Sequence, residues 1–466
     1  MSSHAPNPKQ PVAESSDLAS VLACPRCDRA LEAAGEAWRC EGCRVDFPYI
    51  GAIPWLFAEP DAALGEWRAR LHFALAKLDH ERGELSAALD AKELSALTRR
   101  RLEKLATAKC DHGERLRALL APLGIDAPAA SHETYLALRT RLPVDQGLTT
   151  YYSNVHRDWV WGDEENAASH AIVAERLQGM PPGKTLVLGA GAGRLAYDLH
   201  QKTGAPITVA LDFNPLLLLI AERVTRGEAL ELYEFPLAPL DLEHQAPLRT
   251  LRAPAPARAG LHYVLADAHR PPFGKESFDT VITPWLVDIL PEPFAEFAAR
   301  VNMLLAPGGR WVNFGSLSFH SADPARWLSR EECAEVIAAT GFGAPELAES
   351  TIPYMCSPAS RHGRRERVLS WAAAKTRNTK RAPRHEALPD WLVRGKDPVP
   401  LLDAFRAQAT ATRIHAFIMS LIDGRRSVAD MAQVLEQQNL MTRAEAEPAI
   451  RTFLIKMYED ARRGGF

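Results

Sequence analysis

Five short apolar runs, each followed by turn-forming residues, constrain the fold more than any other feature of the chain. They are TLVLGAG, ITVALDF, LHYVLAD, FDTVITPWL and RWVNFGSL, and helical stretches lie between them after residue 184. Strands that alternate with helices in this way predict a parallel sheet with helices on both faces. We therefore expect an α/β domain over residues 141–378, interrupted by an insertion at 238–260.

The length and composition of the chain limit what else it can be. At 466 residues it is too long for one ordinary domain, and its 47% hydrophobic and 24% charged residues are normal for a globular protein. The net charge of −3 gives no general attraction to nucleic acid or anionic membranes. The longest purely apolar run, residues 216–221, is too short to span a bilayer, and the polar N-terminus lacks the apolar core of a signal peptide. These features predict a cytoplasmic protein that does not enter the membrane.

Shifts in composition divide the rest of the chain into segments. Residues 61–140 are rich in Ala, Leu, Arg and Glu with apolar residues at helical spacing, so we interpret them as a helical spacer or lid. The basic, proline-containing stretch TRNTKRAPRHEALPD is typical of a linker. The remaining expected segments are a flexible leader (1–20), a zinc ribbon (21–60), the linker (379–412) and a C-terminal module (413–466).

Four of the seven cysteines form two Cys-x2-Cys pairs with twelve residues between them: Cys24, Cys27, Cys40 and Cys43. Two such pairs place four thiolates around one tetrahedral ion, which is the ligand set of a structural zinc site. All four positions are filled, so the site leaves no open coordination for catalysis. Free thiols and a redox role are the alternatives. The odd cysteine count, without a secretion signal, argues against a disulfide framework.

The residues after the second cysteine pair give the ribbon a closer likeness. Phe47-Pro48 is followed by Gly51, Ile53 and Pro54 in the pattern Gly-x-Ile-Pro. This segment resembles the small zinc-ribbon proteins that act as activating subunits of several methyltransferases. The resemblance implies that the ribbon docks on the catalytic domain and stabilises it as a covalently attached partner.

A glycine-rich turn follows the first apolar run, at Gly189, Gly191 and Gly193. Glycines there let the backbone turn tightly and approach a ligand closely. Asp212, at the end of the next run, lies where a second strand would bring a carboxylate to two ribose hydroxyls. Nicotinamide enzymes share this logic, but their usual turn is G-x-G-x-x-G, and here the third glycine comes one residue early.

The glycine turn and the downstream segments resemble class I methyltransferases, which use S-adenosylmethionine. In that family the turn passes under the methionine part of the cofactor, and an acid in the position of Asp267 reads the adenine amino group. The turn Pro307-Gly308-Gly309 precedes the fifth strand in the same order. The resemblance implies the following cofactor-binding residues: Arg157, Trp159, Gly189, Ala190, Gly191, Gly193, Asp212, Phe213, Asn214, Asp267 and Ala268.

The catalytic half, residues 151–375, is similar to one branch in particular, the carnosine N-methyltransferases, which methylate an imidazole ring. Three motifs carry this likeness: Arg157-Asp158-Trp159, the run Trp285 to Asp288, and the run Gly315 to His320. The resemblance implies that Asp288 and His320 are catalytic residues over the acceptor. A carboxylate bonded to the imidazole N–H would hold one tautomer and direct the free lone pair at the methyl group.

The chain departs from this family before its final strand. The family has a tyrosine-rich stretch there that encloses the substrate, whereas this chain has SRHGRRERVLSW, with Arg364, Arg365 and Arg367. An aromatic wall is interpreted as lost and positive charge as gained. The expected acceptor is therefore an imidazole-containing small molecule or a histidine-containing peptide. A tRNA or rRNA methyltransferase and a non-catalytic scaffold that binds the cofactor are the alternatives.

The C-terminal module is predicted to be mainly helical. Ser427 is the expected N-cap of one helix, and a second helix is expected at about 445–458. The pattern resembles winged-helix-like chaperone domains that present peptides to modifying enzymes. A plain packing role, a homodimer contact and DNA binding are the alternatives.

Overall fold

The computed structural model describes residues 16–91, 93–124, 151–290, 292–319, 323–380 and 398–463. The chain forms two compact units, Met1–His385 and Glu386–Phe466. In the described segments, no helix combines the length and the apolar character that crossing a membrane requires.

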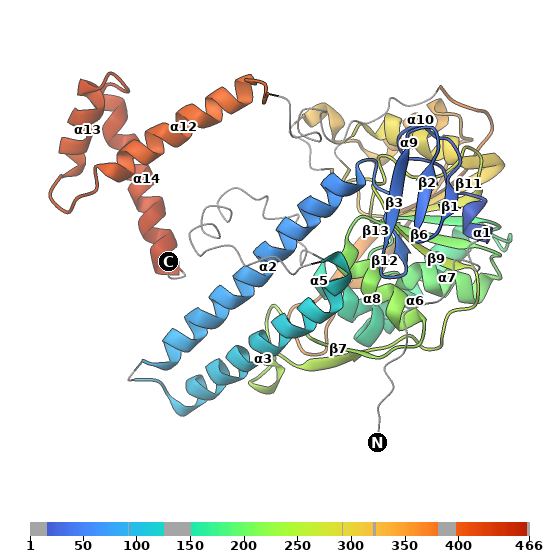
Figure 1. Ribbon diagram of the computed structural model, residues 1–466, viewed down its shortest axis with the longest axis horizontal. Helices are drawn as coiled ribbons and strands as arrows, with labels where there is room; N and C mark the ends of the chain where they lie inside the picture. Colours follow the sequence, from blue (N-terminus) through green and yellow to red (C-terminus); the bar gives the residue numbers. More distant parts are fainter. Residues whose placement is uncertain are drawn as a thin grey trace. The chain divides into compact units, whose positions relative to one another are not determined.

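A seven-stranded sheet organises the first unit, as the alternating pattern predicts (Figure 1). Six of the seven strands run in the same direction, and β13, which pairs antiparallel with β11 and with β12, runs in the opposite one. The first strand along the chain, β5, has its successor β6 on one side and β10 on the other, so the connections change direction between β5 and β10. Such a switch point opens a crevice at the carboxyl ends of the strands, where ligands bind. In spatial order the strands are β12 (Glu346–Tyr354), β13 (Arg364–Ala374), β11 (Leu305–Gly315), β10 (Phe278–Pro284), β5 (Thr185–Leu188), β6 (Thr208–Asp212) and β9 (Leu261–Leu265).

Helices cover both faces of this sheet. Successive strand residues point to opposite faces, so Val187 packs in one apolar cluster while Leu186 and Leu188 pack in the other. The first cluster includes buried residues of α6 (Asp163–Leu177), α7 (Arg194–Thr203) and α8 (Pro215–Thr225). The second includes buried residues of α9 (Phe294–Leu304) and α10 (Arg330–Ala339). This doubly covered α/β sheet confirms the predicted fold class.

The cysteine-rich ribbon is a small antiparallel sheet that docks on strand β9. Leu56 N–H donates to the Leu265 carbonyl over 2.8 Å, and Ala23 N–H donates to the Pro272 carbonyl over 2.8 Å. The first bond covers the carboxyl end of β9, which is the edge strand of the large sheet, and the second ties the ribbon to the segment that follows β9. The docking agrees with the placement that the ribbon's resemblance implies. The ribbon strands are β1 (Glu32–Ala34), β2 (Ala37–Cys40), β3 (Val45–Ile50) and β4 (Ile53–Pro54).

The first folded residues lie inside the range expected as a flexible leader. Helix α1 (Ser16–Ala19) precedes the ribbon, and Leu18 is 4% exposed in the second apolar cluster. Leu18 and Val21 are apolar residues that bury surface in the cluster that includes the docked ribbon, which explains why residues before 20 take part in the fold.

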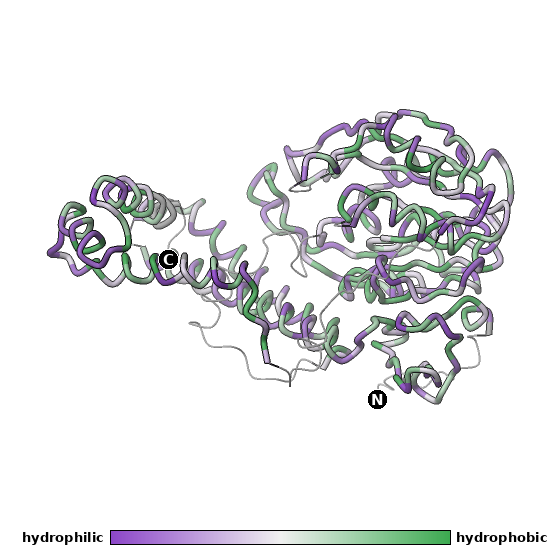
Figure 2. The backbone as a smooth tube through the Cα atoms, turned by 90° about the horizontal axis from the view of Figure 1, so that it is seen from above, coloured by the Kyte–Doolittle hydropathy of each residue, from purple (hydrophilic) through white to green (hydrophobic). Residues whose placement is uncertain are grey.

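A long helical hairpin fills much of the range expected as a helical spacer or lid. It consists of α2 (Pro60–Leu89) and α3 (Ala96–Leu120), and hydrophilic and hydrophobic residues alternate along it (Figure 2). Ion pairs of Lys109 with Glu81 at 2.6 Å and of Arg117 with Asp79 at 3.1 Å join the two helices. The buried residues of α2 lie in its first half, where it packs on the core of the unit. Residues 125–140 of the expected segment lie outside the described residues.

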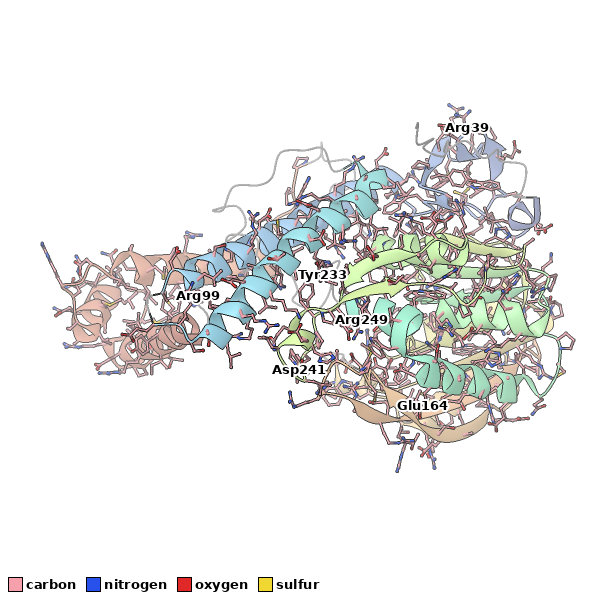
Figure 3. The ribbon with its side chains drawn as sticks, turned by 90° about the horizontal axis from the view of Figure 1, so that it is seen from below. Arg39, Arg99, Glu164, Tyr233, Asp241 and Arg249 are labelled. Atoms are coloured by element: carbon pink, nitrogen blue, oxygen red, sulfur yellow. The ribbon has the colours of Figure 1, made fainter. Side chains whose placement is uncertain are left out.

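The insertion after β6 forms a two-stranded hairpin, β7 (Leu230–Tyr233) and β8 (Leu248–Leu251). Figure 3 labels Tyr233 and Arg249 on this hairpin and Asp241 on the loop between its strands. The insertion therefore begins before residue 238, where the proline-rich composition indicated its start. Short helices elsewhere are η2 (Ala121–Leu123), η4 (Glu243–Gln245) and η5 (Pro324–Arg326).

The C-terminal unit has three helices in its described residues and no strand there. They are α12 (Asp403–Ser420), α13 (Val428–Gln437) and α14 (Arg443–Arg463), and α12 begins inside the range 379–412 that was expected as a linker. Ser427 caps α13 in a reciprocal bond pair with Asp430, which confirms the predicted N-cap. A small apolar core joins the helices: Ile418, Leu421, Met431, Leu435, Ala446 and Ile450.

Candidate active site

The glycine turn lies at the switch point, directly after β5. Gly189, Gly191 and Gly193 have φ angles of 71°, 58° and 86°, a region that residues with a Cβ rarely adopt. A Cβ on Gly193 would lie 2.9 Å from the Ala221 Cβ, so helix α8 also requires glycine there. The backbone N–H groups of Gly189 and Ala190 both donate to the Leu211 carbonyl at 2.9 Å. The turn is thus tied to the end of β6.

Asp212 ends β6 and faces this turn. Its Oδ2 accepts from Gly191 N–H over 2.8 Å, and its Oδ1 accepts from Asn214 N–H over 2.9 Å. Burial raises the pKa of the Asp212 carboxyl to about 6. The structure therefore holds a desolvated carboxyl group against the glycine turn, where a ligand hydroxyl could reach it.

The two residues after Asp212 have different surroundings. Phe213 is 38% exposed, which is high for an aromatic ring beside a buried carboxylate. Asn214 is 1% exposed, and its Oδ1 accepts from Leu216 N–H over 3.0 Å. Asn214 is therefore the N-cap of α8, and it holds the Asp212 carboxylate through its backbone.

Asp267 and Ala268 follow β9 at the same edge of the sheet. The Asp267 Oδ1 lies 2.7 Å from His269 Nδ1 and accepts from His269 N–H over 2.9 Å. The pKa of His269 is raised above its ordinary value. Burial alone would lower this pKa, but the hydrogen bond and the charge of the Asp267 carboxylate outweigh the burial. His269 thus orients the Asp267 carboxylate. Ala268 is 8% exposed.

The Arg157-Asp158-Trp159 motif lies in a π-helical turn, η3 (Arg157–Trp161), after α5 (Tyr152–His156). The buried Trp159 indole N–H donates to the Ala192 carbonyl over 2.8 Å, so this ring supports the glycine turn from behind. The Arg157 guanidinium pairs with Asp158 at 2.7 Å and with Glu165 at 3.2 Å. Both predicted residues therefore brace the site through neighbouring groups.

Trp67 on helix α2 is a site residue that the sequence reasoning missed. Its ring lies 5.8 Å from the ring of Phe213 and is 4% exposed. Arg70 covers the Trp67 ring at 4.9 Å. The first half of α2 thus forms a wall beside Phe213. Helical periodicity predicted α2, but it carried no signal of which residue would face Phe213.

Asp288 lies after β10, on the other side of the switch point. It is 4% exposed, and its Oδ2 accepts from the Ser316 hydroxyl over 2.6 Å and from Ser318 N–H over 2.8 Å. Within the described part of the chain, no group donates to its Oδ1. Helix α9 is capped at Pro293, so Asp288 is not its N-cap. His320, the second predicted catalytic residue, lies outside the described residues.

An aromatic pair includes Trp285, three residues before Asp288. The Trp285 ring lies 4.9 Å from the Tyr354 ring, and the Arg364 guanidinium lies 4.6 Å from the centre of the Tyr354 ring. Trp285 has a φ of 51°, and a Cβ on Gly315 would lie 3.0 Å from the Trp285 backbone. Tyr354 thus places an aromatic ring beside Trp285, close to the arginines that stand where the aromatic wall was interpreted as lost. It comes from β12, opposite Arg364 in the strand register.

The four ribbon cysteines converge on one point. Their Sγ atoms all lie within 4.8 Å of one another, with separations of 3.5 Å for Cys27–Cys40 and 4.0 Å for Cys24–Cys43. Tetrahedral zinc with bonds of ~2.3 Å places sulfurs ~3.8 Å apart. Backbone N–H groups of Arg26 and Cys43 donate to the Cys24 and Cys40 sulfurs at 3.4 Å. The donor set fits a structural zinc ion.

Comparison with known proteins gives one family and a set of distant structures. Residues 145–376 match the model of the family described as carnosine N-methyltransferase. The search of curated proteins gave no match. The chain is 14% identical to phosphoethanolamine N-methyltransferase 2 of Haemonchus contortus, covering 54% of this chain and 62% of that one with a TM-score of 0.34. It is 21% identical to 1,6-didemethyltoxoflavin-N1-methyltransferase of Burkholderia thailandensis, covering 54% and 93% with a TM-score of 0.31. These structural likenesses are too distant to support an argument. The likeness to methyltransferases therefore rests on the family match over residues 145–376.

Proposed function

We propose that this chain, which carries the carnosine N-methyltransferase family segment over residues 145–376, transfers the methyl group of S-adenosylmethionine to an imidazole nitrogen. The acceptor is an imidazole-containing small molecule or a histidine-containing peptide. The observation that carries this proposal is the hydrogen bonding of the Asp288 carboxylate. Its Oδ2 is held by Ser316 and Ser318, while within the described residues its Oδ1 has no donor.

The cofactor would lie across the switch point. The methionine part would lie against the glycine turn at Gly191, where an added Cβ would meet nothing within 4 Å, and Asp212 would accept from the ribose hydroxyls. Asp267, oriented by His269, would accept from the adenine amino group. When bound, S-adenosylmethionine supplies an activated methyl group on a sulfonium. Phe213 would flank the adenine ring, with Trp67 behind it.

Asp288 would act on the acceptor through its Oδ1. A neutral imidazole has one N–H and one nitrogen with a free lone pair. Accepting the N–H bond fixes the tautomer, so that the lone pair of the other nitrogen is directed at the methyl donor. The Asp288 carboxylate also stabilises the positive charge that develops on the ring as the new N–C bond forms. We retain His320 as a second acceptor-binding residue in this proposal.

Trp285 and Tyr354 would orient the ring and exclude water. Flat aromatic side chains suit a flat imidazole, and aromatic faces favour a ring that gains positive charge. Trp285 has a left-handed backbone, and such strained residues are frequent at functional sites, which supports this role.

The ribbon would be a structural partner of the catalytic sheet. Zinc held by Cys24, Cys27, Cys40 and Cys43 would supply the folding energy of a segment too small for a large core. The folded ribbon then keeps β9, the strand that precedes Asp267, paired along its edge. Reduced thiolates fit a cytoplasmic setting.

The test is transfer of a labelled methyl group to carnosine, free histidine, histidine-containing peptides, and the RNA and protein fractions of a cell extract. We expect label on imidazole compounds, with Asp212→Ala as the blank. Asp288→Asn should lower kcat at least a hundredfold, because its amide cannot replace the carboxylate's charge and acceptor capacity together. The variant should still bind S-adenosylmethionine. Label on RNA alone, or an unchanged kcat for Asp288→Asn, contradicts the proposal.

A further inference from the structure

A cluster of basic residues lies at the turn end of the β12–β13 hairpin. We call it the basic rim, and its members are Arg361, His362, Arg364, Arg365 and Arg367. In the strand register Leu369 pairs with Gly315, the last residue of β11. Residues 364–367 therefore extend beyond the carboxyl end of β11. Asp288 and the serines that hold it lie at this same edge of the sheet.

Few acidic groups neutralise the basic rim. Glu366 pairs with Arg364 at 2.6 Å, and the nearest Glu349 oxygen is 4.0 Å from Arg367. Glu349 also pairs with Arg330 at 3.0 Å, so its charge is shared. Arg365 is exposed and has no acidic partner among the residues that the structure describes. Opposed by so few acids, the rim keeps an excess of positive charge.

The turn that bears the rim is held in place. Arg361 N–H donates to the Ala238 carbonyl over 2.7 Å, and the Ser357 hydroxyl donates to the buried Glu234 carboxylate. At the start of the turn, Met355 N–H donates to Glu165 over 2.7 Å. A loop tied to the insertion and to α6 keeps its charges at a set position relative to the crevice. A solvated face would need no such ties.

A stack of side chains leads from one rim residue, Arg364, to Trp285, which is close in sequence to Asp288. The Arg364 guanidinium packs on the Tyr354 ring, and this ring packs on Trp285, three residues before Asp288. An acceptor whose imidazole lies beside Asp288 would therefore extend its flanking groups along the rim. Guanidinium groups bind carboxylates through paired N–H donors, so an acidic flank would be favoured there.

We propose that the basic rim is a substrate subsite that binds carboxylates flanking the methylated imidazole, and that the acceptor is an acidic histidine-containing peptide. This inference rests on the proposed function. Arg364 is already paired with Glu366 and packed on Tyr354, so it is not free to bind a carboxylate. Arg365 and Arg367, which lie on the opposite face of β13 because successive strand residues alternate, are therefore the determinants of specificity. The peptide lies along the carboxyl edge of β11 and β13.

The experiment compares two blocked pentapeptides with a central histidine, one flanked by four glutamates and one by four glutamines. In the full-length protein we expect kcat/KM to be roughly tenfold higher for the acidic peptide, the size of two exposed charge contacts. The double variant Arg365→Gln, Arg367→Gln should bring the ratio close to one. The control, Arg223→Gln, Arg226→Gln, removes the same charge from the far end of α8 and should keep the tenfold ratio.

Each other outcome overturns a defined part of the argument. Equal rates for the two peptides, methylation of carnosine alone, or a ratio unchanged in the rim variant would refute the subsite while leaving imidazole methylation intact. A rim variant that loses activity equally on both peptides would show a structural role only, and would also refute it. Label on RNA that the rim variant abolishes would replace the acidic peptide with a nucleic acid. Absence of label on every imidazole compound would remove the proposed function itself.

Discussion

At Asp212 the proposed cofactor binding requires a buried carboxylate, and burying that carboxylate lowers the stability of the fold. Burial raises the pKa of its carboxyl from 3.8 to about 6, and two pKa units correspond to about 3 kcal/mol. The folded protein therefore holds this proton more tightly than the unfolded chain does. The resulting loss of stability is absent below about pH 4, grows as the pH rises, and is complete above about pH 6.

Asp212→Asn removes this cost but also one hydrogen bond. An amide nitrogen cannot accept from Gly191 N–H or from Asn214 N–H, so one of these donors loses its partner. That loss costs about 1–2 kcal/mol. We therefore expect the variant without cofactor to gain about 1–2 kcal/mol in its free energy of unfolding at pH 7.5, a rise of a few degrees in Tm.

Differential scanning calorimetry of the full-length variant and wild type at pH 7.5 and pH 5 measures this difference. The advantage of Asp212→Asn should shrink at pH 5, where much of the wild-type carboxyl is already protonated. Titration calorimetry at pH 7.5 should show a dissociation constant for S-adenosylmethionine at least tenfold higher. Asp90→Asn, at an exposed acid after α2 for which the described residues show no side-chain hydrogen bond or ion pair, is the control and should change neither quantity. A variant no more stable than wild type at pH 7.5 would refute the burial argument.

Three further changes test other parts of the site. Trp67→Ala removes a buried ring and should lower the free energy of unfolding by about 3–5 kcal/mol. Trp67→Phe should keep the contact with Phe213 and most of the affinity for S-adenosylmethionine, as measured by titration calorimetry. Equal losses of affinity in the two variants would contradict the role of Trp67 as a wall beside Phe213. Chelation of zinc should lower Tm and cause aggregation, measured by light scattering, because β9 loses the ribbon that covers its end. An unchanged Tm, with release of the metal confirmed, would contradict the proposal that the ribbon stabilises the catalytic sheet. Gly315→Ala should reduce kcat at least tenfold while far-UV circular dichroism stays unchanged, because the added alanine Cβ displaces Trp285. Turnover at the wild-type rate would show that Trp285 does not contact the acceptor.

The sheet, and the contact of the glycine turn with Asp212, could be predicted because they depend on local signals. The glycine turn, the acids after two strands and the alternating runs each lie within a few residues of the element they predict. The strand bearing Asp212 and the turn at Gly191 had to adjoin once the sheet was parallel. The cysteine spacing predicted convergence in the same way, because two short pairs limit how far the sulfurs can separate.

The acceptor half depended on contacts between distant segments, which local patterns do not report. Tyr354 faces Trp285 only because the register of β12 and β13 sets it opposite Arg364. The serines that hold Asp288 follow a different strand, and no spacing rule connects Ser316 to a carboxylate 28 residues earlier. Trp67 reaches Phe213 through the packing of a whole helix on the core.

The two halves of the site also differ in what supports them. Phe213 packs on Trp67, and β9, which precedes Asp267, is paired by Leu56. Both supports lie before residue 145, outside the segment that matches the family. Asp288, Trp285 and Tyr354, in contrast, are positioned by strands of the family segment itself. Damage to the ribbon or to α2 should therefore act first on the affinity for the cofactor, whereas changes in β10 to β13 should act on the choice of acceptor. Measuring both constants in one series of variants separates these two dependences.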